Sequence, residues 1–196
     1  MTTEMFGIAS LAVTLVQYVP YCWKTYAGRL RPHVFSYIIW GFGSAIVAAA
    51  QWTAGAGPGA WAMALVACLC FLVVALSLRG GVQYVTRTDI GTFACALLAL
   101  PIWYVTSDPL FAVIVITLID VAAFCMIFNK ARKHPDEDSV LFYVVAMLQY
   151  VLSIAAMENL NVTTLLNPVA LVVCALSVIF AMWRNRTRAK VIAVNE

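Results

Sequence analysis

The segment LFAVIVITLIDVAAFCMIF, residues 110–128, decides the fold class of this chain. It is an apolar run with one charged residue, Asp120, and it has the length of about 20 residues that a helix needs to cross a bilayer. Six similar runs lie at about residues 5–23, 34–52, 61–78, 90–105, 139–157 and 165–183. The sequence therefore predicts an all-α membrane protein with seven transmembrane helices.

The composition excludes an ordinary soluble protein. Hydrophobic residues make up 64% of the chain and charged residues 11%, whereas soluble domains contain roughly one-half and one-quarter. A net charge of +3 in such a chain gives no reason to expect a nucleic-acid partner. The six cysteines lie inside or at the ends of apolar runs, where thiols act as small packing residues, so we expect neither a metal nor a cofactor.

The positions of the basic residues orient the predicted helices. All 12 lysines and arginines follow the first, third, fifth or seventh run, within residues 24–31, 79–87, 130–133 and 184–190. Basic residues stay on the cytoplasmic side of a membrane during insertion. We therefore expect an integral protein of the bacterial cytoplasmic membrane, with the N-terminus outside and the C-terminus in the cytoplasm.

The chain contains a predicted internal repeat. Shifted by 103 positions, TLVQ at 14–17 aligns with TLID at 117–120, and a cysteine, an arginine, a proline and a serine also align further along. This divides the chain into a first three-helix repeat (1–78), a linker helix with its flanking loops (79–109), a second three-helix repeat (110–183) and a cytoplasmic tail (184–196). Both repeats have the same orientation, an architecture known among transporters.

The segment PYCWKTYAGRLRPHVFSYIIWGFGS, residues 20–44, carries a family resemblance. It resembles the repeat of the PQ-loop and SWEET superfamily, and the matching positions are Pro20, Lys24, Tyr26, Ser36 and Trp40. Tyr21 replaces the glutamine of the motif, and Ala123 and Phe124 stand at the motif pair in the second copy. The resemblance implies a SWEET-like transporter in a three-plus-one-plus-three layout, with Pro20 as a hinge. A kink at Pro20 that only shapes packing is the alternative.

Asp120 is the principal candidate for function, because it is the acidic residue in the middle of a predicted span. A carboxylate there costs several kcal/mol, so it is by default a functional hypothesis. We predict that Asp120 couples transport to protons or contacts substrate, with Gln17 opposite it in the other repeat. The alternative is a protonated acid that only bonds a neighbouring helix.

A second polar set lies toward the predicted outer half of the membrane: Gln51, Gln149, Tyr150, Ser153 and Asn167. The resemblance to sugar transporters implies a substrate-binding asparagine on the third helix of each repeat. Asn167 lies near that position, but the first repeat has Met63 and Ala64 there, which argues against a sugar. Hydrogen bonds between helices are an equally good explanation of these residues. Trp40 is either a pocket wall or a packing residue.

We therefore predict a transporter that moves a small polar metabolite by alternating access, with the substrate and the lipid bilayer as its partners. The sequence leaves the number of subunits open, a homo-oligomer included. A retinal photoreceptor would need a lysine in the seventh span, and residues 165–183 contain none. An enzyme is not expected, because both histidines lie in predicted cytoplasmic loops and no paired intramembrane carboxylates occur. A signalling or scaffold protein on the same fold is the alternative.

Overall fold

The computed structural model describes residues 2–29, 34–78, 87–133 and 140–195. These residues form seven α-helices and one short 3-10 helix, without a strand: α1 (Thr3–Tyr26), α2 (Val34–Thr53), η1 (Gly57–Ala60), α3 (Trp61–Ser77), α4 (Arg87–Thr106), α5 (Pro109–Lys133), α6 (Val140–Ala155) and α7 (Val162–Asn195). The all-α class is confirmed.

Most helices begin and end close to the predicted runs because capping and breaking residues stand there, but α7 continues to Asn195, twelve residues beyond the run predicted to end at 183. The side chain of Thr2 caps α1 by accepting from the Met5 amide at 3.4 Å. Gly28, with a φ of 67°, follows the end of that helix, and the left-handed region is one that glycine enters without strain. Pro109 opens α5, where a missing amide hydrogen costs nothing. A carboxylate oxygen of Asp108 accepts from the Leu110 amide at 2.8 Å.

Three segments in the described part of the chain are long and apolar enough to cross a membrane: Thr3–Tyr26, Gly57–Ser77 and Val162–Arg184. Two shorter apolar helices, Pro109–Phe124 and Tyr143–Ala155, accompany them. Large apolar side chains also face outward, and Val16, Trp23 and Trp183 are each more than 60% exposed. These features are compatible with an integral membrane protein. Seven spans, their orientation and the domain boundaries stay predictions.

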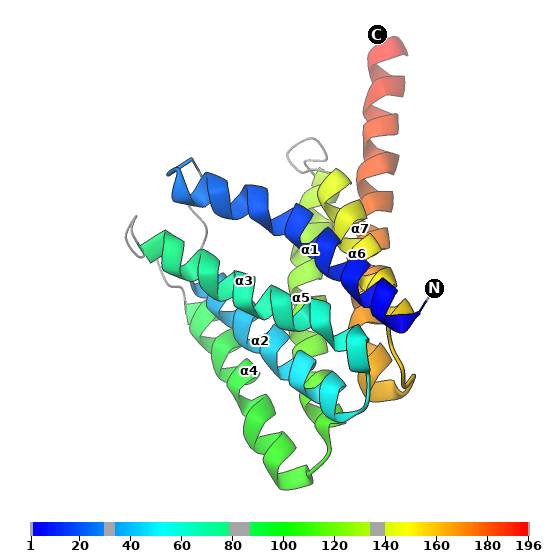
Figure 1. Ribbon diagram of the computed structural model, residues 1–196. Coiled ribbons are helices and arrows are strands. Elements are labelled where there is room, and N and C mark those ends of the chain that lie inside the picture. Colours follow the sequence, from blue (N-terminus) through cyan, green and yellow to red (C-terminus); the bar gives the residue numbers. More distant parts are fainter. Residues whose placement is uncertain (1, 30–33, 79–86, 134–139, 196) are drawn as a thin grey trace.

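The helices pack as two sets of three (Figure 1). In the first set, α3 packs against both α1 and α2, and in the second set α7 packs against both α5 and α6. Between the sets, α1 packs against α6 and α2 packs against α5. Exchanging α1, α2 and α3 for α5, α6 and α7 therefore reproduces the same pairs. Helix α4 lies outside this pattern and packs against α5 and α2.

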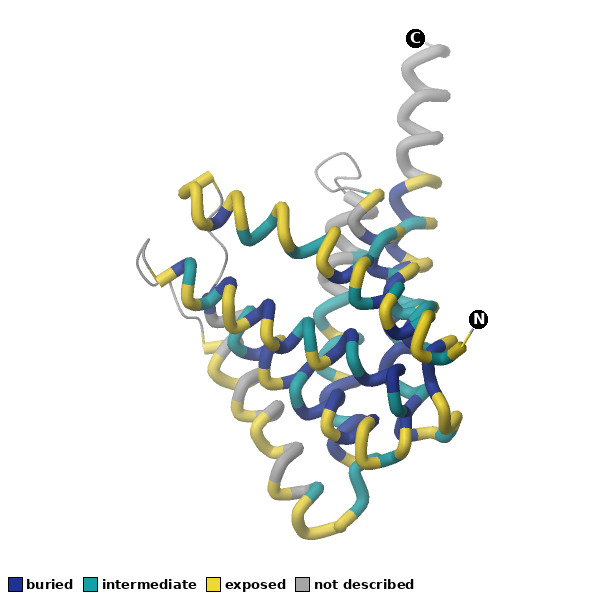
Figure 2. The backbone as a smooth tube through the Cα atoms, viewed as in Figure 1, coloured by how far each residue is buried: buried dark blue, intermediate teal, exposed yellow. Residues whose placement is uncertain are grey.

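Buried residues gather where the two sets meet (Figure 2). One apolar cluster joins α2, α3 and α5 through residues that include Val47, Met63 and Ile116. A Cβ atom on Gly43 would lie 3.3 Å from Cγ2 of Ile116, so this glycine lets α2 and α5 approach closely. Such contacts between small and branched residues are typical of helix pairs in membranes.

Five hydrogen bonds, which we call the loop clasp, join residues 51–59 of the first set to residues 153–164 of the second. The donors are Gln51 Nε2 to the Thr164 carbonyl (3.0 Å), Ser153 Oγ to the Gly59 carbonyl (2.5 Å), Asn159 Nδ2 and Asn161 Nδ2 to the Ala54 carbonyl (3.2 and 3.0 Å) and the Glu158 amide to the Ala56 carbonyl (3.1 Å). The clasp lies at the end of the molecule that carries the α2–α3 and α6–α7 connections.

Pro168 explains why the clasp includes a carbonyl inside α7. A proline within a helix has no amide hydrogen, so the carbonyl four residues earlier loses its usual partner. Pro168 lies inside α7, and the residue four positions earlier is Thr164, whose carbonyl accepts instead from the fully buried side chain of Gln51. The carbonyl group that Pro168 leaves without a partner in the second set thereby accepts a hydrogen bond from a glutamine of the first set.

We predict that Gly59→Ala destabilises the protein through the clasp. A Cβ atom on Gly59 would lie 3.0 Å from both the Ser153 carbonyl oxygen and Cα of Met157. Neither backbone group can yield without moving the end of α6, so we expect a loss of about 1–3 kcal/mol in the free energy of unfolding. Unfolding in mixed detergent micelles measures this loss.

The matched control is Gly91→Ala in α4. A Cβ atom there would meet nothing within 4 Å, and alanine is the better helix former by up to about 1 kcal/mol. This variant should be as stable as the parent or slightly more so. Equal losses in the two variants would contradict the packing explanation.

Candidate functional site

Asp120 of α5 is held by a side chain of α7. Asn167 donates through Nδ2 to Asp120 Oδ2 at 3.0 Å and to Thr117 Oγ1 at 3.3 Å. Thr117 and Asp120 are three residues apart on α5 and so lie on the same face. The structure thus brings together two predicted site residues, Asp120 and Asn167, that belong to separate polar sets in the sequence-based prediction.

These contacts fix the orientation of the Asn167 amide. When Asp120 is ionised its carboxylate can only accept hydrogen bonds, so the group that then faces it is the NH₂ of Asn167 and not its oxygen. The amide oxygen, Oδ1, is buried and has no hydrogen-bond partner among the described residues. A carboxylate and a free carbonyl oxygen therefore belong to the same small group of side chains.

Asp120 lies on the side of α5 that faces the other helices. Ile116, one turn earlier, meets α2 at Gly43, and Thr117 meets α7 at Asn167. Asp120 follows both at helical spacing, so it lies between these two contacts. The phenol of Tyr150, on α6, is within electrostatic range of the Asp120 carboxyl group. Three helices of the second set and one of the first therefore surround this position.

Gln17 lies at the position of α1 that the predicted repeat aligns with Asp120. Its side chain is partly buried, and its Oε1 atom has no partner among the described residues. Helix α1 packs against α3 and α6, and Asp120 pairs with Asn167 of its own set. That Gln17 faces Asp120 across a central cavity stays a prediction.

Tyrosines and a cysteine near Gln17 were not predicted as site residues. The hydroxyl of Tyr18 lies 3.8 Å from Sγ of the buried Cys70 on α3, and Tyr18 is within electrostatic range of Tyr150 and Tyr37. Tyr18 and Tyr21 lie at helical spacing on α1, which is the sequence signal that would have placed them on one face. They line the inner face of the first set.

Trp40 belongs to an aromatic group and not to the Asp120 pair. Its ring meets Tyr37 edge-on, with the centroids 5.3 Å apart, and Tyr37 in turn lies 5.6 Å from the ring of Tyr21. Trp40 is 38% exposed. These contacts favour the packing interpretation of Trp40 over the pocket-wall interpretation.

The remaining predicted residues lie elsewhere. Gln149 is 2% exposed and its Nε2 atom has no partner among the described residues. Gln51 and Ser153 belong to the loop clasp. Pro20 is exposed inside α1, and the helix continues to Tyr26. Its role as a hinge stays a prediction.

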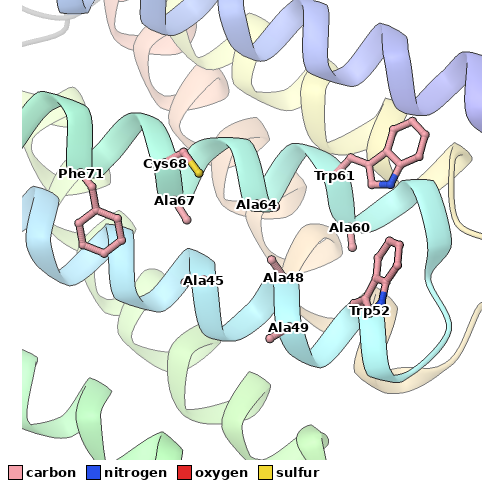
Figure 3. Close-up of a pocket in the computed structure, with 10 residues that line it drawn as sticks. All are labelled: Ala45, Ala48, Ala49, Trp52, Ala60, Trp61, Ala64, Ala67, Cys68 and Phe71. Atoms are coloured by element: carbon pink, nitrogen blue, oxygen red, sulfur yellow. The ribbon is translucent and has the colours of Figure 1, made fainter.

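An apolar groove of about 470 Å³ lies between α2 and α3 (Figure 3). Alanines of both helices form its walls, with Trp52, Trp61 and Phe71 around them. None of the predicted site residues lines this groove, and it offers almost no polar group to a metabolite. The Asp120 pair, not the groove, is therefore the candidate site.

Neither a protein-family model, nor a curated protein, nor a solved structure matches this chain. The resemblance to the PQ-loop and SWEET superfamily therefore stays a prediction that rests on the residues of the 20–44 segment. The function has to be argued from the helix packing and from the Asp120 pair.

We predict that Asp120 and Asn167 are energetically coupled. Asn167→Ala should lower the free energy of unfolding by about 1–3 kcal/mol, because it leaves a partly buried carboxyl group without its donor. Adding Asp120→Ala should cost little more, because the unpaired group is then gone. A double-mutant cycle measured by unfolding in micelles should give a coupling energy of at least about 0.5 kcal/mol.

Ser177→Ala on the same helix is the control. Ser177 is exposed and donates only to the Val173 carbonyl of its own helix, at 2.8 Å, so its loss should cost less than about 0.5 kcal/mol. Strictly additive effects of the Asp120 and Asn167 variants would mean that the pair does not form.

Proposed function

We propose that this protein is a seven-span membrane transporter that moves a small polar metabolite by alternating access. In this proposal, the two sets of helices are SWEET-like repeats with the same orientation, α4 links them, the N-terminus is outside and the C-terminus is in the cytoplasm. Its main support is the exchange symmetry of the helix pairs. Repeats related in this way place substrate between the halves near the middle of the membrane.

The two ends of the molecule support alternating access because they differ. The loop clasp joins the sets at the end where the connections carry no lysine or arginine. At the opposite end, the C-terminal parts of α1 and α3 point away from the C-terminal part of α5 and the start of α6 (Figure 1). A transporter closed outside and open toward the cytoplasm would have this arrangement. Moving to the opposite state requires that the clasp opens.

Asp120 is the proposed coupling group. It is a partly buried carboxyl group among apolar helices, where a bound proton removes the cost of the charge. A proton gradient would then bias which state of the transporter is populated.

We predict that Asp120→Asn abolishes stimulation of uptake by a pH gradient. The amide has nearly the shape of the carboxyl group and can still pair with Asn167, so folding should be retained while the exchangeable proton is lost. Labelled sugars, amino acids and vitamin precursors offered to proteoliposomes, with and without a gradient, provide the measurement. The control is Glu4→Gln, which removes an exposed carboxylate in the first turn of α1.

Gradient-driven uptake that survives Asp120→Asn at the parent rate would overturn the coupling role. If no solute crosses and the purified protein instead binds a partner protein, a signalling or scaffold function replaces the transporter proposal.

We also predict that locking the clasp stops transport. Asn159 Nδ2 lies 3.2 Å from the Ala54 carbonyl oxygen, so the two residues are neighbours across the clasp, and cysteines introduced as Ala54→Cys and Asn159→Cys should be linked by a short bismethanethiosulfonate reagent. The linked protein should lose most of its uptake, and a reductant should restore it. Each single variant, treated in the same way, controls for the native cysteines. Full uptake by completely linked protein would contradict alternating access through this end.

A further inference from the structure

We propose that the site at Asp120 takes a solute that carries a protonated amine, and this inference rests on the transport function proposed above. The observation that carries it is the juxtaposition of the Asp120 carboxyl group with the Asn167 amide, whose oxygen has no partner. A solute that satisfies both groups has to donate hydrogen bonds, and an ammonium group donates three.

With Asp120 ionised, the orientation of Asn167 disfavours an anionic solute. Both contacts made by its Nδ2 atom, to Thr117 and Asp120, use its donor side, so only an acceptor remains. An anionic solute would bring further hydrogen-bond acceptors to the Asp120 carboxylate and the Asn167 amide oxygen, which both need donors.

The charge balance favours the same class of solute. No lysine or arginine occurs within residues 5–23, 32–78, 88–129 or 134–183. The first basic residue after Asp120 on α5 is Lys130, about 15 Å along the helix axis. A carboxylate among apolar helices needs a counter-charge, so it has to come from a proton or from the solute.

An aromatic side chain of the second set lies near the proposed site. Tyr150 of α6 is within electrostatic range of the Asp120 carboxyl group. The face of a tyrosine ring attracts a cation, and this attraction is stronger away from water. Neutral polyols would gain less from such rings, which separates an amine from a sugar as the substrate.

The test uses the purified full chain in proteoliposomes exposed to a metabolite extract, with the accumulated solutes identified by mass spectrometry. Ammonium-bearing solutes should be enriched over protein-free liposomes. Uptake of two labelled probes, ethanolamine and putrescine, should exceed that of their neutral counterparts, ethylene glycol and 1,4-butanediol. Asp120→Asn should lower uptake of the amines by about tenfold or more, because a hydrogen bond to a charged group is lost.

Glu4→Gln is the control for loss of a carboxylate, and the unfolding midpoint of Asp120→Asn shows that the variant is folded. Enrichment of neutral or anionic solutes, unchanged in Asp120→Asn, would overturn the amine inference while the transport function stands. If no solute is enriched by the parent protein, the proposed function falls, and this inference falls with it.

Discussion

A polar side chain buried among apolar helices needs a hydrogen-bond partner inside the protein. Serine and threonine can use a carbonyl of their own helix, as Ser10 and Thr14 do, whereas the side-chain amides of Gln51 and Asn167 donate to other helices. In this chain that constraint determines where the two sets of helices meet. Gln51 is fully buried and donates to a carbonyl that Pro168 has freed in α7. Asn167, one residue before that proline, is also fully buried and donates to Thr117 and Asp120. One turn of α7 therefore serves both the clasp and the candidate site.

The two sets share a packing pattern but differ in chemistry. The second set contains the carboxyl group of Asp120 and its asparagine. The first set has Gln17 at the place that the predicted repeat aligns with Asp120, and a tyrosine–cysteine contact between Tyr18 and Cys70. In the proposed transporter, a carboxyl group at the interface in only one of the two sets would give that interface a direction, since only this set would exchange a proton or bind a cation there. This asymmetry is what distinguishes the proposed coupled transporter from a symmetric pore.

The positions of the helices could be predicted from the sequence because length and composition determine them. The run at 110–128 became α5, and the run at 34–52 became α2, with ends displaced by a few residues. The pairing of Asp120 with Asn167 could not be predicted, because 47 positions separate them and neither run reveals which face meets the other. The hydrogen bond of Gln51 does have a signal in the sequence, because a proline at position 168 leaves the carbonyl of Thr164 without its usual partner in the helix.

Every acceptor in the loop clasp is a main-chain carbonyl, at Ala54, Ala56, Gly59 and Thr164. A carbonyl is supplied by any amino acid, and so is the main-chain amide of Glu158, whereas the other four donors are side chains that depend on the identity of Gln51, Ser153, Asn159 and Asn161. The residues that supply these carbonyls can thus be substituted as long as the backbone keeps its path and close contacts such as that of Gly59 are preserved. Mutational tolerance at this end of the molecule should therefore be one-sided, with the side-chain donors intolerant and most of their targets permissive.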